Sequence, residues 1–216
     1  MAVFRLNKEI VFPNPDLAEE DGLLAVGGDL RPERLVLAYC NGIFPWYNPG
    51  EEILWWCPKP RFIIYPEKIK ISKSMRKIID KRKFKVTFNK DFSGVISNCK
   101  SIRENREGTW ITDEMKEAYI RLFNLGLAMS VEVYQEDTLV GGLYGVKIGK
   151  CFFGESMFSN VSNASKIALI SVAKKLAEEN FLFIDCQMHT SHLESMGGEF
   201  LPWDTFKEML RDGTKL

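Results

Sequence analysis

Two apolar segments of the chain carry acidic and amide side chains at positions where buried strands normally carry only apolar ones. The run 151–159 contains Glu155, and the run 183–187 contains Asp185 and Gln187. A buried carboxylate is costly unless it is paired or hydrogen-bonded. Either acid could form a structural ion pair or lie at a strand end in water, yet perturbed carboxylates also gather at functional sites. The pattern predicts a catalytic cleft.

The elements around these residues predict how the acids are brought together. Side chains alternate along a strand, so Asp185 and Gln187 should point to one side and Ile184 and Cys186 to the other. A strand over 150–158, a helix over 163–179 and a strand over 181–188 imply a right-handed crossover with parallel pairing of the two strands. Glu155 and the acid–amide pair should then lie on neighbouring strands.

The remaining periodicity predicts an α+β protein with two parts. Proline and glycine turns fill residues 1–60, which excludes long elements there apart from a helix over 32–39 and predicts a small N-terminal domain. Residues 61–216 should form a larger domain with a mixed sheet flanked by helices. Its other expected elements are helices over 72–80, 91–100, 112–126 and 203–210, a strand over 84–88, and an antiparallel meander over 127–135, 138–148 and 150–158.

Composition excludes several classes of protein. The 216 residues are 45% hydrophobic and contain no apolar run long enough for a membrane span or a signal peptide, so we expect a globular cytoplasmic protein without a membrane partner. The five cysteines have no C-x-x-C spacing and should be reduced thiols. Cys186, His189 and His192 are a weak metal pattern, and no metal is expected.

Charge is unevenly distributed along a chain of zero formal net charge. Residues 61–100 carry 12 basic and 3 acidic side chains. A solvated surface is the usual fate of such a run, but its excess over an acidic remainder favours a polyanionic partner. The basic residues expected to contact that partner are Lys73, Arg76, Lys77, Lys81, Arg82 and Lys83.

The predicted element order resembles the N-acyltransferase (GNAT) fold of acetyl-CoA-dependent enzymes. Those enzymes hold the CoA pyrophosphate with a glycine-rich loop at a helix N-terminus. The corresponding stretch here, residues 158–165, has no glycine. The CoA cradle therefore should be absent, although a CoA-dependent N-acyltransferase stays an alternative.

A set of motifs resembles the bacterial leucyl/phenylalanyl-tRNA–protein transferases over nearly the whole chain. The motifs are Gly22–Leu30, Asn41–Trp46, Leu54–Pro58, Gly108–Thr112, Leu139–Gly145, Gly154–Ser159, Asn163–Lys166 and Ile184–Gln187. The resemblance implies transfer of Leu or Phe from aminoacyl-tRNA to the N-terminal Arg or Lys of a protein, which marks that protein for degradation. The basic block would then contact tRNA.

The resemblance also implies roles for individual residues. Trp110, and secondarily Trp46, would stack on the terminal adenosine of the tRNA. Gln187 would orient the attacking amine, Asp185 would act as the base through Gln187, and Glu155 would hold amino or cationic groups of the substrates. The donor pocket would be lined by Leu143, Phe152, Met157, Val172 and Ile184.

The apolar donor pocket predicts some tolerance for the donor side chain. Such a pocket discriminates only weakly between side chains that differ by one methylene, so Met is a possible third donor. Aminolysis of an activated ester requires no covalent intermediate. No cofactor is expected, and the enzyme should be a monomer. Two other classes stay open: a non-catalytic RNA-binding module, and an arginyl-type transferase, which the missing N-terminal cysteine cluster disfavours.

Overall fold

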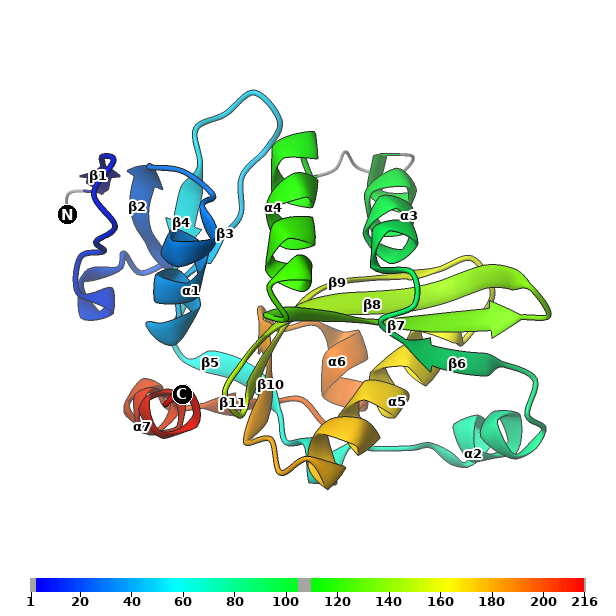
Figure 1. Ribbon diagram of the computed structural model, residues 1–216. Coiled ribbons are helices and arrows are strands. Elements are labelled where there is room, and N and C mark those ends of the chain that lie inside the picture. Colours follow the sequence, from blue (N-terminus) through cyan, green and yellow to red (C-terminus); the bar gives the residue numbers. More distant parts are fainter. Residues whose placement is uncertain (1–2, 105–109, 216) are drawn as a thin grey trace.

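The computed structural model describes residues 3–104 and 110–215, which form an α+β protein with two sheets (Figure 1). The first sheet has the order β1-β2-β4-β3 and consists of β1 (Phe4–Leu6), β2 (Leu23–Gly27), β3 (Phe44–Pro45) and β4 (Leu54–Trp56). The expectation of short elements in this turn-rich region is confirmed. Helix α1 (Pro32–Cys40) starts with a proline, whose missing N–H is not needed in the first turn.

The second sheet has the order β11-β5-β10-β9-β8-β7-β6 in the described part of the chain. The antiparallel meander of β7, β8 and β9 is confirmed, as is the parallel pairing of β9 with β10. The strands are β5 (Arg61–Ile64), β6 (Lys85–Phe88), β7 (Ala128–Gln135), β8 (Thr138–Ile148), β9 (Cys151–Ser159), β10 (Phe183–Gln187) and β11 (Glu199–Leu201).

Helices cover both faces of the second sheet (Figure 1). Helices α3 (Phe92–Glu104) and α4 (Asp113–Asn124) lie on one face, and α5 (Ala164–Glu178) lies on the other. The predicted cap of α4 is confirmed, because the Thr112 hydroxyl accepts a hydrogen bond from the Met115 N–H at 3.1 Å. The remaining helices are α2 (Lys73–Asp80), α6 (Ser191–Ser195) and α7 (Trp203–Gly213), with short 3-10 turns at Pro15–Leu17 and Pro66–Lys68.

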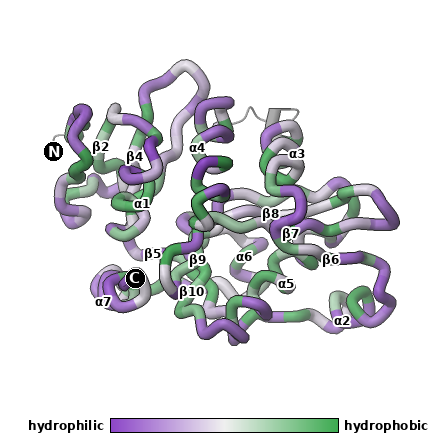
Figure 2. Tube along the Cα trace, in the orientation of Figure 1, coloured by the Kyte–Doolittle hydropathy of each residue, from purple (hydrophilic) through white to green (hydrophobic). Residues whose placement is uncertain are grey.

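The buried apolar side chains form two clusters. One contains residues of α3, α4 and α7 together with Tyr39 and Trp55 from the first 60 residues, so the N-terminal segment shares a core with the second sheet. The other cluster lies between the sheet and α5 and includes Met75 of α2. Figure 2 shows hydrophobic positions in α5 and the central strands, and hydrophilic ones along the turn after α2. No described helix combines the length and apolar character needed to cross a bilayer.

Candidate active site

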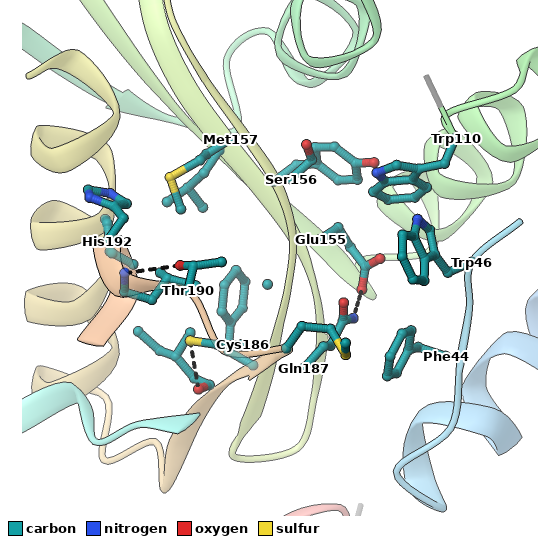
Figure 3. A pocket seen from close by; sticks show the side chains of 18 of the residues that line it. Phe44, Trp46, Trp110, Glu155, Ser156, Met157, Cys186, Gln187, Thr190 and His192 are labelled. Atoms are coloured by element: carbon teal, nitrogen blue, oxygen red, sulfur yellow. Dashed lines mark hydrogen bonds between the residues drawn. The ribbon is translucent and has the colours of Figure 1, made fainter. Parts of the chain in front are cut away.

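A cavity of about 410 Å³ lies where β9 and β10 separate (Figure 3). The parallel pairing of these strands covers only Cys151–Phe153 and Phe183–Asp185. The residues just beyond that pairing, at 154–157 and 186–188, line the cavity from its two sides. The lining is mostly apolar with a few polar groups, which is typical of a small-ligand site.

Both separating strands carry a β-bulge at the cavity. Tyr144 of β8 pairs with Ser156 and Gly145 pairs with Gly154, so Glu155 is the extra residue of β9. A second register shift lies between Asp185 and Gln187 of β10. Bulges redirect side chains and occur frequently beside active sites. Here they aim the polar groups of both strands into the region between them.

The second bulge makes the expected alternation on β10 wrong. Gln187 lines the cavity together with Ile184 and Cys186, whereas Asp185 does not line it. Gln187 has φ of 63°, in the left-handed region that non-glycine residues rarely adopt. The irregular backbone, rather than strand alternation, therefore places the Gln187 amide in the site.

Glu155 is held by three donors. Its Oε1 accepts hydrogen bonds from the Tyr39 hydroxyl at 2.8 Å and from Gln187 Nε2 at 3.2 Å, and its Oε2 accepts one from the Tyr119 hydroxyl at 2.7 Å. The tyrosines come from α1 and α4, far from Glu155 in sequence. Figure 3 shows Glu155 and Gln187 between the two ends of the cavity.

Burial gives the Glu155 carboxyl an unusual proton affinity. Desolvation raises its pKa to about 7, the hydrogen bonds from Tyr119 and Tyr39 oppose that rise, and the charge of Asp185 adds to it. A carboxyl with a pKa near neutrality can exchange a proton at physiological pH, as acid–base catalysis requires. Among the described residues that line the cavity, Glu155 is therefore the one whose carboxyl is suited to accept a proton.

Asp185 forms a buried ion pair behind the cavity wall. Its Oδ1 lies 3.2 Å from Arg61 Nε, and both side chains are 1% exposed. The same oxygen accepts a hydrogen bond from the backbone N–H of Gln187 at 2.9 Å. Burial raises the pKa of Asp185, while the Arg61 charge opposes the rise. Asp185 thus contacts the backbone of Gln187, whereas the expected relay runs through the Gln187 side chain.

Four of the five predicted pocket residues line the cavity, namely Leu143, Phe152, Met157 and Ile184. Val172 does not, because it is fully buried in the cluster between α5 and the sheet. Leu169, one helical turn earlier on α5, lines the cavity instead. The apolar stripe of α5 includes both residues, so its periodicity could not distinguish the one that reaches the cavity.

The two predicted tryptophans lie at one end of the cavity, opposite Met157 and His192 (Figure 3). Trp46 is 42% exposed and Trp110 is half-buried. Phe44 contributes a third ring at this end. Gly108 and Thr109 of the motif that contains Trp110 lie outside the described residues.

Sequence reasoning missed Tyr39, Tyr119 and Arg61. Each tyrosine occupies an apolar position of its helix, which is the pattern of an ordinary core residue. Arg61 is fully buried, with its guanidinium over the rings of Phe44 and Phe206. Since all three reach the site through contacts between distant segments, no local pattern identifies them.

The predicted basic residues lie on α2 and the turn that follows it, where all six are exposed. Arg82 and Lys83 also line a separate groove with Lys174 of α5. The structure thus brings these cations together on one part of the surface, apart from the cavity.

Comparison with known proteins identifies the chain. The sequence model of the family "Leucyl/phenylalanyl-tRNA protein transferase" matches residues 63–211, and the sequence model of the N-terminal domain of this family matches residues 28–59. The leucyl/phenylalanyl-tRNA–protein transferase of Syntrophus aciditrophicus is 56% identical over 98% of this chain and 89% of its own length. That of Flavobacterium johnsoniae is 54% identical over 97% of this chain and 99% of its own length.

Solved structures resemble the fold only distantly. An aminoglycoside acetyltransferase from a soil metagenomic sample has a TM-score of 0.41 and 15% identity, and covers 54% of this chain and 85% of its own. This likeness is too weak to define the fold.

The sequence matches define an aminoacyltransferase that uses charged tRNA. The cavity fits this class, because its apolar lining suits an apolar side chain and lies beside a carboxyl that can accept a proton. The chain belongs to the leucyl/phenylalanyl-tRNA protein transferase family. It transfers Leu or Phe from tRNA to protein N-termini, and the alternative of a CoA-dependent acyltransferase is not favoured.

Proposed function

We propose that this enzyme transfers Leu, Phe and, more slowly, Met from aminoacyl-tRNA to proteins that begin with Arg or Lys, and so marks them for degradation. The observation that carries the proposal is an apolar cavity with Glu155 and Gln187 at its centre and a pair of tryptophans at one end. We further propose that the enzyme acts as a monomer. Charged tRNA as the donor supports a cytoplasmic location.

The cavity lining supports a donor with an apolar side chain. Leu143, Phe152, Met157 and Ile184 surround it, and Leu169 closes it from α5. Burial of a Leu, Phe or Met side chain contributes about 1.5–3 kcal/mol. Charged side chains would lose their hydration without gaining a partner in this part of the cavity, so they are rejected.

The ends of the cavity support the positions of the two substrates. Trp110 and Trp46 offer ring faces to the terminal adenosine, so the ester bond would lie near Gln187. The carboxylate of Glu155 favours an incoming amino terminus with a nearby positive charge, as in proteins that begin with Arg or Lys. Gln187 would orient the amine, and Asp185 would keep the backbone of Gln187 in place.

The division of the chain is also a proposal. The strand order and the parallel β9–β10 pair that separates at the cavity support an N-acyltransferase (GNAT-like) fold for residues 61–216. The first sheet ends at Trp56 and the second begins at Arg61, which supports a boundary near residue 60.

A product assay tests the proposed specificity. The enzyme is incubated with Leu-, Phe-, Met- or Lys-charged tRNA and with peptides that differ only in an N-terminal Arg, Lys or Glu. We expect mass spectrometry to show addition of Leu, Phe and Met to the Arg and Lys peptides, and none from the Lys donor or to the Glu peptide. Equal transfer to the Glu peptide would contradict the acceptor assignment.

The basic surface makes a separate prediction about salt. Reversal of Lys81 and Lys83 to Glu should raise the KM for charged tRNA and reduce the slope of log KM against log salt by about one for each lost phosphate contact. The matched control reverses Arg211 and Lys215, which are also exposed and lie on α7 and just after it, on the opposite side of the molecule from α2 in Figure 1. Equal slopes in both double variants would exclude α2 and its turn as the tRNA surface.

A further inference from the structure

We propose that Glu155, Tyr39 and Tyr119 form a three-membered hydrogen-bonded ring that takes up the proton lost by the attacking amine and returns it to the leaving ribose oxygen. Glu155 is the catalytic residue of this ring, and the two tyrosines are positioning residues. The inference deepens the role of Glu155 in the proposed function, and it rests on the transfer reaction of the family.

The ring is defined by three short oxygen–oxygen contacts. The Tyr39 hydroxyl lies 2.8 Å from Glu155 Oε1, the Tyr119 hydroxyl lies 2.7 Å from Glu155 Oε2, and the two hydroxyls lie 2.7 Å from each other. Distances of this size are typical of O–H···O hydrogen bonds. All three side chains are buried, and Glu155 still lines the cavity.

The number of protons in the ring depends on the charge of Glu155. With an ionised carboxylate, the two hydroxyls supply two protons for three contacts, so one contact has no proton between its oxygens. A protonated carboxyl supplies the third: Glu155 donates to Tyr39, Tyr39 to Tyr119, and Tyr119 back to Glu155. The three side chains can thus hold one additional proton, and each of the three contacts then has a proton between its oxygens. A closed set of hydrogen bonds of this kind is cooperative.

The surroundings allow both states of the ring. The Tyr39 and Tyr119 hydroxyls and the Gln187 amide favour the ionised carboxylate, whereas burial and the charge of Asp185 favour the neutral form. Arg61 offsets the charge of Asp185 from β5. Tyr144 of β8 is a further titratable group beside these residues, because its side chain packs against the aromatic ring of Tyr119. These opposing effects keep the pKa of the carboxyl at about 7.

The proposed step conserves atoms and charge. The neutral amine forms a C–N bond with the ester carbonyl carbon and passes one N–H proton to the ionised Glu155. The C–O bond to the ribose then breaks, and the ring returns that proton to the ribose oxygen. The products are a new peptide bond and a free ribose hydroxyl, and Glu155 is again ionised.

The pH dependence of transfer separates this role from a structural one. Removal of a hydroxyl that donates to the carboxylate raises the pKa of Glu155, so less of the base is ionised at low pH. For Tyr39→Phe and Tyr119→Phe we expect the acid limb of kcat/KM to move to higher pH by about one unit, which is a roughly tenfold lower rate below the limb. Above the limb the rates should approach that of the wild type.

Two further variants complete the experiment. Glu155→Gln should lower transfer at all pH values by about 100-fold or more, because it removes the general base. Tyr65→Phe is the matched control, because the Tyr65 hydroxyl lies 4.0 Å from the Met209 sulfur and takes no part in the ring. The acid limb of this variant should not move. The substrate amine titrates identically in every case, so a shift between variants belongs to the enzyme.

A measurement without substrate keeps the proposal testable if a variant transfers poorly. Infrared difference spectra of the protein, titrated through neutral pH, should show a protonated-carboxyl band that is absent in Glu155→Gln and titrates at higher pH in Tyr119→Phe. An unmoved acid limb in both tyrosine variants together with an unmoved band in Tyr119→Phe, or wild-type rates in Glu155→Gln, would overturn the proposed role of the ring. Failure of the wild type itself to transfer would instead refute the proposed substrates.

Discussion

Arg61→Met should lower the free energy of unfolding by about 3–5 kcal/mol and reduce transfer at least tenfold. The substitution leaves Asp185, which is 1% exposed, without its cationic partner. It also removes the hydrogen bond from the Arg61 guanidinium to the Gly42 carbonyl. Chemical denaturation and single-turnover transfer measure the two effects.

A double variant separates the loss of the ion pair from the loss of the site. Arg61→Met with Asp185→Leu replaces the pair with apolar side chains, so stability should recover toward the wild-type value. Transfer should stay low, because the backbone N–H of Gln187 no longer has its acceptor. Arg5→Met is the control for arginine removal, since its pair with Glu52 is exposed and should leave stability almost unchanged. Recovery of full transfer in the double variant would exclude a positioning role for Asp185.

Trp110→Ala should raise the KM for charged tRNA by about 5- to 150-fold and change kcat much less, because stacking of a base on an aromatic ring contributes about 1–3 kcal/mol. Trp110 lines the end of the cavity proposed for the adenosine. Steady-state kinetics over a range of tRNA concentrations separates the two constants. Trp110→Phe keeps a ring face and should lose only a small part of the affinity.

A shortened donor distinguishes stacking from contacts with the tRNA body. With an aminoacyl-adenosine in place of the whole tRNA, the Trp110→Ala defect should persist. The defect caused by reversing Lys81 and Lys83 should disappear, because the phosphates that they contact are missing. If Trp110→Ala and wild type use the short donor equally well, the adenosine lies elsewhere.

The sequence was most informative where structure depends on near neighbours. The meander of β7–β9, the cap at Thr112 and the crossover through α5 follow from turn residues, capping chemistry and periodicity, and all are observed. These signals arise within a few residues of one another, so a single sequence contains them in full.

The geometry of the site could not be predicted in the same way. Its decisive features are a bulge at Glu155, a second irregularity before Gln187, and partners from distant segments. Tyr39 is 116 positions from Glu155, and nothing local indicates which apolar-face tyrosine meets a carboxyl. A one-residue bulge also reverses strand alternation, which is why Asp185 and Gln187 do not share the cavity.

Tyr39 lies in the N-terminal segment of the chain, so this segment contributes to the active site of the larger C-terminal part. Helix α1 lies in the part matched by the N-terminal family model, whereas Glu155 lies in the part matched by the other. A gene fragment encoding residues 61–216 alone would produce a chain with the carboxyl but with only one of its two hydroxyl donors. An exchange of either segment between proteins would therefore have to preserve the contact between Tyr39 and Glu155 as well as the fold of each part.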